Sequence, residues 1–465
     1  MTKRLRVLLA LVMLLVPARA WAHAHLRRSE PAAGSRLTAP PLMIRLWFSE
    51  QPELSMTFAS LKDSTGREVP LGSAGSGATA QLQIAFRVLG TLSPGRYTLT
   101  WRTAASDGHP SHGKFIFTVL GIAGTVPGAI APPVVRSPVA GDSSLIGEPS
   151  TTPTNMEEES DGASSLGNSI ARALEFVSLL ALIGAVTFRS FVLPRARAVA
   201  AQLREKMAIR AAWLGLISGV ALILVGLGRL GLELQMMNAM PDMPTMTGMS
   251  AKAMVMHTAW GFAFYSQLIA ASVALAAFAL AIRSMRGAWS AAVVAAIVLA
   301  ATPAFAGHAA ASPRFTSLMI AGDLLHVLGG SSWLGTLLAV MLIGVPIALT
   351  LEGAARWSSV ESLVEAFSPL ALISAALVFA SGIFASWIHL ERFSALWRTS
   401  YGEVLIVKLL LVAITLGIGA YNFKRVQPEL STERGTWRLR RSAALELGAG
   451  LLILLVTGLL TGISP

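Results

Sequence analysis

Long apolar runs separated by short polar loops fill the C-terminal two thirds of the chain. Each run approaches the ~20 residues that a helix needs to cross the hydrocarbon core of a bilayer. The runs cover residues 170–192, 211–232, 259–282, 288–305, 318–351, 369–388, 404–421 and 443–462. The pattern predicts an all-α membrane bundle of eight transmembrane helices over residues 166–465.

A different pattern precedes these runs. Leu42, Ile44, Leu46 and Phe48 alternate with more polar positions, which is typical of a half-buried strand. Further strand candidates are residues 54–61, 81–88, 95–102 and 114–120, with turn residues at 63–66 and 93–95. Several short strands over about a hundred residues predict an all-β sandwich over residues 23–120.

The first 22 residues have the features of a secretory signal peptide. A basic start precedes an apolar run at 7–16 and the small-x-small pattern Ala20-Trp21-Ala22. Cleavage after Ala22 would leave His23 with a free α-amine, whose pKa of about 7.7–8.0 lets a metal displace its proton near neutral pH. The amine and the imidazole of His23 would then chelate one ion. The alternative is that a histidine follows the cleavage site by chance.

Residues 121–165 are rich in Pro, Gly, Ser and Thr and carry few large apolar side chains. This composition predicts a flexible linker between the sandwich and the membrane domain. The acidic run Glu157–Glu159 within it is interpreted as solvated charge.

Composition narrows the function classes. The chain is 54% hydrophobic and only 13% charged, and a mean hydropathy of +0.62 agrees with a mostly membrane-embedded protein. The net charge of +12 does not indicate nucleic-acid binding, because most Lys and Arg lie in short loops between apolar runs. Their distribution predicts a multi-pass protein of the cytoplasmic (inner) membrane, with the N-terminal domain and the C-terminus outside the cytoplasm.

The chain contains no cysteine. A disulfide framework is therefore excluded, and a transition metal would be held by His, Met, carboxylate or backbone groups. A phosphate-binding loop is absent from the sequence, so ATP does not power transport within this chain.

Asp107 and His109 lie on a Gly/Pro-rich turn between the last two predicted strands. Two ligands on one turn can point at a single ion, although a plain polar hairpin loop is the alternative. His112 is interpreted as a solvated loop residue.

The start His23-Ala-His-Leu-Arg-Arg-Ser-Glu-Pro, the strand end Leu46-Trp-Phe-Ser-Glu and the segment Ser106-Asp-Gly-His-Pro resemble CopC, a family of periplasmic copper-binding β-sandwiches. The resemblance implies an immunoglobulin-like or cupredoxin-like Greek key. It also implies that Cu(II) is held by the amine and imidazole of His23, by Asp107 and by His109, a nitrogen-rich donor set that suits this ion. His25, with the amine and two backbone amides, is a second way to bind Cu(II).

The histidines of the membrane domain fall near one face of the predicted bundle, and Asp323 is on the same helical side as His326. Charged groups within the spans need partners or water; they are Glu175, Arg229, Glu233, Asp323 and Lys408. The predicted layer of metal ligands consists of His257, His308, Asp323, His326 and His389. Interfacial histidines that anchor helix ends are the alternative.

A methionine occurs at every third position of the loop that follows the second span. Pro and polar residues share this loop, so a continuous apolar face is excluded, and thioethers select Cu(I). The predicted Cu(I) donors are Met237, Met240, Met243, Met246 and Met249.

The segments Gly307-His-Ala, Asp323-Leu-Leu-His-Val-Leu-Gly-Gly and Tyr401-Gly-Glu-Val-Leu-Ile-Val-Lys resemble CopD, the inner-membrane partner of CopC. The chain therefore resembles a CopC–CopD fusion. The resemblance implies a non-enzymatic protein that binds copper outside the cytoplasmic membrane and transports it inward, in contact with lipid and with periplasmic copper donors or acceptors. The alternatives are a membrane chaperone that delivers copper to extracytoplasmic enzymes and a haem-b redox protein.

Overall fold

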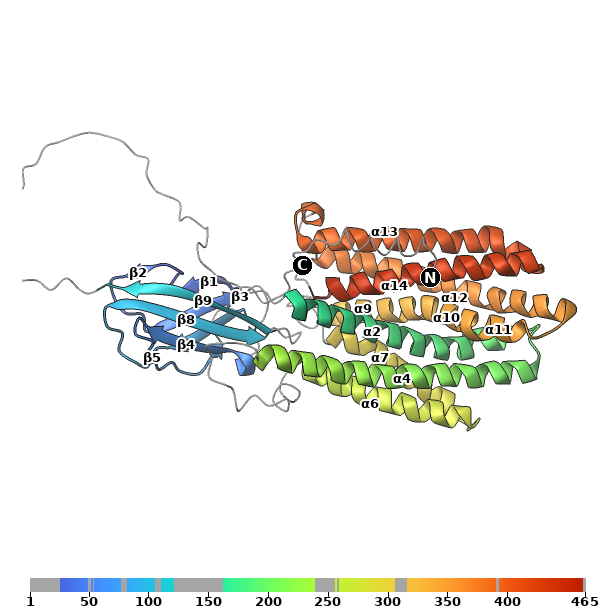
Figure 1. Ribbon diagram of the computed structural model, residues 1–465, viewed down its shortest axis with the longest axis horizontal. Coiled ribbons are helices and arrows are strands. Elements are labelled where there is room, and N and C mark those ends of the chain that lie inside the picture. The colour runs from blue at the N-terminus through green and yellow to red at the C-terminus, as the bar shows by residue number, and fades with distance from the viewer. Residues whose placement is uncertain are drawn as a thin grey trace, which may run out of the picture.

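The computed structural model describes residues 26–48, 52, 54–76, 82–104, 110–120, 162–238, 256, 259–305, 316–389 and 393–462. Strands occupy the first part of this sequence and helices the second. Figure 1 shows the helices side by side along one axis. The strands lie beyond one end of the bundle, the end at which helix α4, Ala201–Asn238, finishes.

The described strands form two sheets that pack face to face. One sheet has the order β1-β3-β7-β6 and the other β2-β9-β8-β4-β5. The strands are β1 Leu26–Glu30, β2 Arg36–Leu37, β3 Met43–Phe48, β4 Phe58–Asp63, β5 Glu68–Val69, β6 Gly75–Ser76, β7 Gln83–Arg87, β8 Gly95–Ala104 and β9 Pro110–Val119. A single apolar cluster joins residues of both sheets, which confirms the predicted all-β sandwich.

The alternating pattern at 42–48 was predicted to be one strand, and most of it is. Ile44, Leu46 and Phe48 point into the core and are almost fully buried. Leu42, however, precedes β3 and is 81% exposed. Its side chain does not follow the alternation because the chain reaches the sheet only at Met43; the Leu42 carbonyl accepts a hydrogen bond from Val88 N.

Four strands were not predicted from the sequence. β2, β5 and β6 have two residues each, too few to show a period. β1 buries only Leu26 and Ser29 among Arg and Glu residues, so its pattern resembles a polar loop. It is nevertheless a strand because it pairs antiparallel with β3 along the edge of the sheet.

The turn predicted at 63–66 is confirmed. Asp63 Oδ1 accepts hydrogen bonds from Thr65 Oγ1 at 2.6 Å, from Thr65 N at 2.9 Å and from Arg67 N at 3.0 Å. The Thr65 hydroxyl, followed by these amides, holds the pKa of Asp63 below its ordinary value. A carboxyl with a lowered pKa stabilises the fold at neutral pH, and this contribution is lost as the pH falls through that pKa.

Gly113 provides room for the largest buried side chain of the sandwich. Gly113 in β9 lies opposite Trp101 in β8, and a Cβ at this position would lie 2.9 Å from Trp101 Cζ2. We expect Gly113→Ala to lower the free energy of unfolding of the exported fragment 23–120 by about 1–3 kcal/mol, because the indole would have to shift within a packed core. Urea unfolding followed by tryptophan fluorescence measures this.

Gly75→Ala is the matched control for that substitution, because a Cβ there meets Ala85 O at an ordinary 3.8 Å. Equal stabilities of the two variants would contradict the proposed contact.

The helices of the second part are long and connected by short turns. They are α2 Gly162–Thr187, η2 Phe188–Val192, α3 Leu193–Arg195, α4 Ala201–Asn238, α6 Ala259–Ile282, α7 Ala288–Phe305, α9 Thr316–Gly330, η3 Ser331–Gly335, α10 Thr336–Ala339, η4 Val340–Gly344, α11 Val345–Ala348, α12 Gly353–His389, η5 Phe393–Trp397, α13 Ser400–Tyr421, η6 Asn422–Val426, η7 Gln427–Glu429 and α14 Glu433–Leu460. Within the described residues, eight helical stretches are long and apolar enough to cross a membrane, as predicted.

Three of these helices begin ten or more residues before the predicted apolar runs. α4 begins at Ala201, α12 at Gly353 and α14 at Glu433, whereas the predicted runs begin at 211, 369 and 443. The first helical turns of these helices contain polar or charged residues, so a search for continuous apolar residues does not include them. Pro369 therefore lies inside α12 and does not start it.

The first span, α2, lies in the middle of the bundle. It packs against α4, α14 and the π-helical segment η3. Gly184 of α2 and Gly335 of η3 meet backbone to backbone, since a Cβ at Gly184 would overlap the Gly335 carbonyl group. Two apolar clusters flank this contact, one toward α11 and α12 and one toward α6 and α7.

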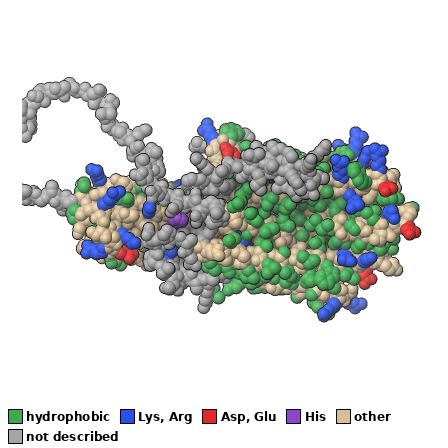
Figure 2. Space-filling model, in the orientation of Figure 1, with side chains coloured by type: hydrophobic (Ala, Val, Ile, Leu, Met, Phe, Trp, Pro, Cys, Tyr) green, Lys and Arg blue, Asp and Glu red, His purple; other side chains and the backbone are tan. Residues whose placement is uncertain are grey.

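Lys and Arg side chains gather at one end of the bundle. Figure 2 shows them at the end farthest from the sandwich, with an apolar surface along the flank between the two ends. They lie in the turns between spans or in the adjoining ends of the helices, and include Arg197, Arg283, Arg356, Lys424 and Arg434. This is the charge distribution expected of a membrane protein whose basic loops face the cytoplasm.

Candidate functional site

The predicted Cu(II) ligands His23, His25, Asp107 and His109 lie outside the described residues, but the strand ends next to them are described. β1 begins at Leu26, three residues after His23. β8 ends at Ala104 and β9 begins at Pro110, so the residues between them connect two paired strands.

These strand ends lie at the same end of the sandwich. Leu26 is paired with Phe48, and the Phe48 ring meets the Trp101 ring edge to face, with centroids 5.1 Å apart. Trp101 is three residues before the end of β8, a distance of about 10 Å along a strand. The start of β1 and the end of β8 therefore lie close together across the two sheets.

The base of the β8–β9 hairpin is tied to the rest of the sandwich. Thr103 Oγ1 lies 2.7 Å from Thr57 Oγ1 in the interior, and the Arg102 guanidinium lies 5.3 Å from the centre of the Phe58 ring. His112, interpreted above as a loop residue, is instead a half-buried residue of β9 opposite Arg102. That prediction was wrong because β8 and β9 extend further toward the turn than their apolar residues indicate.

The membrane part contains a cavity of about 950 Å³ between its helices. Most of its lining is apolar or aromatic, and the side chains come from α2, α4, α6, α7, α9, α12, α13 and α14. Its ionisable lining residues are Arg172, Glu175, Arg229, Asp323, His326, Tyr401 and Lys408. The cavity therefore brings together four of the charged residues that the sequence predicted to need partners: Glu175, Arg229, Asp323 and Lys408.

His326 is oriented in this cavity by polar contacts with α12, one to Ser381 and one to the backbone of Val378. Its Nδ1 lies 3.0 Å from Ser381 Oγ of α12. The single proton of that hydroxyl is directed at the carbonyls of Leu377 and Val378, at 2.6 and 3.2 Å. Ser381 must then accept, so Nδ1 carries the imidazole proton and Nε2 keeps its lone pair. A histidine held in this way by its second nitrogen is the usual form of a metal ligand.

Asp323 lies one helical turn before His326 and lines the same cavity. Its charge acts on two residues of α13, Tyr401 and Lys408, and the charge of Lys408 acts on His326. A carboxylate, an imidazole and an ammonium group therefore interact within one pocket, in surroundings where charges are weakly screened.

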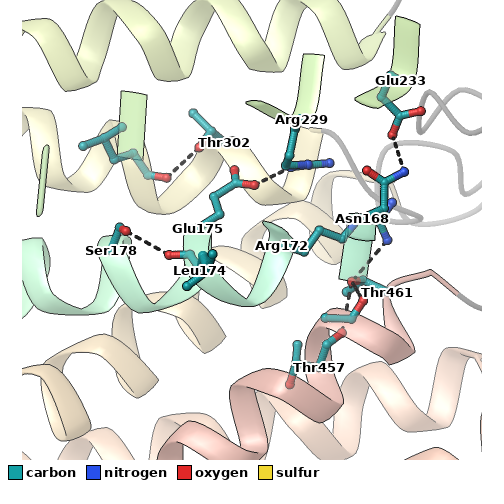
Figure 3. Close-up of polar contacts among 12 residues, drawn as sticks. Asn168, Arg172, Leu174, Glu175, Ser178, Arg229, Glu233, Thr302, Thr457 and Thr461 are labelled. Carbon is teal, nitrogen blue, oxygen red and sulfur yellow. Dashed lines mark hydrogen bonds and ion pairs between the residues drawn. The ribbon is translucent and has the colours of Figure 1, made fainter. Parts of the chain in front are cut away.

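A second polar group lies beside the cavity, on the face of α2 that carries Asn168, Arg172 and Glu175. Figure 3 shows Glu175 ion-paired to Arg229 of α4. One turn further along α4, Glu233 Oε1 accepts from Asn168 Nδ2 at 3.2 Å. Arg172 Nη1 donates to Thr461 Oγ1 of α14 at 3.4 Å. The prediction that Glu175, Arg229 and Glu233 need partners is confirmed.

The predicted layer of metal ligands is only partly visible. His389 is the last residue of α12 and Met237 lies in the last turn of α4. The other predicted ligands lie outside the described residues: the histidines His257 and His308, and the Cu(I) donors Met240, Met243, Met246 and Met249. Among the residues that the structure does describe, no three His, Asp or Glu side chains form a group that could hold a metal ion.

Sequence reasoning missed Glu446, a carboxyl buried in the centre of the bundle. It is 3% exposed and accepts hydrogen bonds from Trp333 Nε1 and from Asn422 Nδ2, both at 2.9 Å. The signal was present in the sequence, because Glu446 is a lone acidic residue in the predicted span 443–462.

Models of known families match both parts of the chain. The CopC domain matches residues 26–120. The N-terminal domain of copper resistance protein D-like proteins matches residues 162–314, and copper resistance protein D matches residues 361–460. The chain belongs to the copper resistance family as a CopC–CopD fusion. It is thus a multi-pass membrane protein of a family associated with copper resistance and transport.

Individual proteins are similar to all or part of the chain. The copper transport protein CutJ of Bacillus subtilis is 24% identical over 98% of this chain and 77% of its own length. Protein YobA of Escherichia coli K12 is 34% identical over 23% of this chain and 85% of its own length. The crystal structure of CopC from Methylosinus trichosporium OB3b is 30% identical and covers 22% of this chain and 96% of that chain, with a TM-score of 0.20.

Proposed function

We propose that this CopC–CopD fusion captures Cu(II) outside the cytoplasmic membrane and transports copper inward through its helical bundle. Copper handling follows from the family, whereas the direction, the ligands and the path are the content of the proposal. The observation that carries it is the position of His326, which lines a cavity between the helices while its Nδ1 is held by Ser381.

The capture site is formed by the amine and imidazole of His23, by Asp107 and by His109. The start of β1 follows His23, and the end of β8 precedes Asp107 and His109. These two strand ends lie close together because Phe48, which pairs with the first residue of β1, contacts Trp101 near the end of β8. Their proximity supports the proposed site. One carboxylate and a set of nitrogen donors suit Cu(II). Processing of the leader peptide after Ala22 would generate the first ligand.

The transfer stage uses the thioethers of Met237, Met240, Met243, Met246 and Met249 and the imidazoles of His257, His308, His326 and His389. Their support is the course of the chain: α4 ends and α6 begins on either side of the methionine segment, and α12 ends at His389. Asp323 adds a carboxylate beside His326 in the cavity.

The inward direction follows from the proposed orientation. The basic turns lie at the end of the bundle away from the sandwich, and such loops remain in the cytoplasm. The sandwich and the C-terminus would then lie outside, in the periplasm of a cell with two membranes, and the protein would lie in the inner membrane.

Reconstitution of the full chain into liposomes tests the proposal. With the sandwich facing outward, radioactive copper is expected to accumulate inside vesicles that contain the protein, above the level in protein-free vesicles. Binding of copper without accumulation would contradict transport and would favour the chaperone function.

A further inference from the structure

Glu446 lies at the middle of the last span. It is thirteen residues after the start of α14 and fourteen before its end, or about 20 Å from each end at 1.5 Å per residue. A carboxyl at this depth is costly in a bilayer unless it is neutral or paired. It does not line the cavity described above, so the copper path does not account for it.

The carboxyl is held by two donors and by no cation of the described residues. Oε1 accepts from the indole of Trp333 and Oε2 from the amide of Asn422. Arg440 and Arg441 of α14 and Lys424 and Arg425 of η6 are the charged residues that flank the two partners in sequence, and all four are exposed. The helices α2 and α13 also pack against α14, and their charged residues Arg172, Glu175 and Lys408 line the cavity.

Both donors belong to π-helical segments. Trp333 lies in η3 and Asn422 begins η6. Single π-helical turns within α-helices are frequent at functional sites, because they displace side chains from the regular helical register. Here they direct two polar groups from different spans at one carboxyl.

Trp333 and Asn422 differ in the hydrogen-bonding groups that they can present to Glu446. The indole N–H only donates, so Oε1 must remain an acceptor. The side chain of Asn422 carries both a donor and an acceptor, and its Oδ1 is buried and accepts no hydrogen bond within the described part of the chain. Rotation of this amide by half a turn would present Oδ1 to Oε2. The ionised carboxylate is satisfied in the first arrangement and the protonated carboxyl, with its proton on Oε2, in the second.

We propose that Glu446 is a proton-binding site in the middle of the membrane and that its proton is exchanged during copper transport. The Asn422 amide can bond to the carboxyl of Glu446 in both protonation states, as a donor to the carboxylate and, after rotation, as an acceptor from the protonated form. This inference rests on the proposed function, since it supplies the proton coupling for the same transport.

A route for the coupling runs along the fifth span. Trp333 is seven residues after His326 in one continuous helical stretch, about 10 Å along the axis. A copper ion bound by His326 would repel the proton on Glu446, because opposing positive charges are weakly screened in this interior. Arrival of the ion would thus release the proton from Oε2, and its departure would allow a proton to bind again.

The test compares the full-length protein with Glu446→Gln in proteoliposomes. Glutamine keeps an acceptor for Trp333 and an N–H for Asn422 Oδ1, and therefore mimics the protonated carboxyl. We expect an imposed pH gradient to change the initial rate of radioactive copper uptake by the wild type and to have no effect on the variant. The control Glu365→Gln removes an exposed carboxyl of α12 and should respond as the wild type does.

Infrared spectroscopy of the same preparations provides a measurement that does not depend on transport. A carbonyl band of a protonated carboxyl should appear in the wild type as the pH is lowered, remain in Glu365→Gln and be absent from Glu446→Gln. An unchanged band in Glu446→Gln would overturn the proton site. A band that is lost while the response of uptake to the pH gradient persists would overturn the coupling. A wild type that moves no copper would refute the proposed function, and the band would still test the proton site.

Discussion

Alanine at Asp107 or His109 is expected to weaken Cu(II) binding by the full chain by more than about 100-fold. Loss of a group that merely supports a metal ligand costs 10–100-fold in affinity, so loss of a ligand itself should cost more. Competition titration of the purified protein against a Cu(II) chelator of known affinity measures the change. The same loss is expected when a residue is added before His23, because the α-amine is then displaced from the imidazole.

His112→Ala is the matched control for this series, because His112 lies in β9 three residues after His109 and faces Arg102. Its affinity for Cu(II) should equal that of the wild type. If His25→Ala abolishes binding while Asp107→Ala does not, the ion is held by the N-terminal backbone and the capture site has been assigned incorrectly.

His326→Ala should reduce copper uptake into proteoliposomes about tenfold or more while Cu(II) binding by the sandwich stays unchanged. The imidazole is the proposed nitrogen ligand in the cavity, and removal of a ligand is expected to lower metal affinity by at least this factor. Reduced uptake with unchanged Cu(II) binding would show that His326 acts in the passage of copper through the bundle and not in its capture by the sandwich. Uptake equal to that of the wild type would remove His326 from the copper path.

Ser381→Ala is the graded control for His326. The substitution removes the acceptor for Nδ1 and leaves the imidazole in place. Uptake should fall by less than in His326→Ala, because the ring is still present but its orientation is no longer fixed. A larger effect at Ser381 than at His326 would contradict the assignment of the imidazole as the ligand.

Hydropathy predicts much of the bundle because its signal is local. Every apolar run of suitable length became a helix that can cross a membrane. The sequence also predicted which charged residues would need partners, and Glu175 and Arg229 form an ion pair although they are 54 positions apart. Lipid does not solvate charges, so such residues must find one another or water.

The sequence could not predict the groups that depend on how the helices cross. The tautomer of His326 is set by Ser381, which is 55 positions away. The environment of Glu446 is set by Trp333, 113 positions away, and by Asn422. Strands β2, β5 and β6 were not predicted because two residues each show no pattern, and only pairing with another strand defines them.

The contact of Gly184 with Gly335 determines how closely the first and fifth spans approach. With no side chain between them, the two backbones lie in direct contact, and a side chain at either position would force the helices apart. The position of the first span beside the π-helical segment that carries Trp333 therefore depends on both residues being glycine.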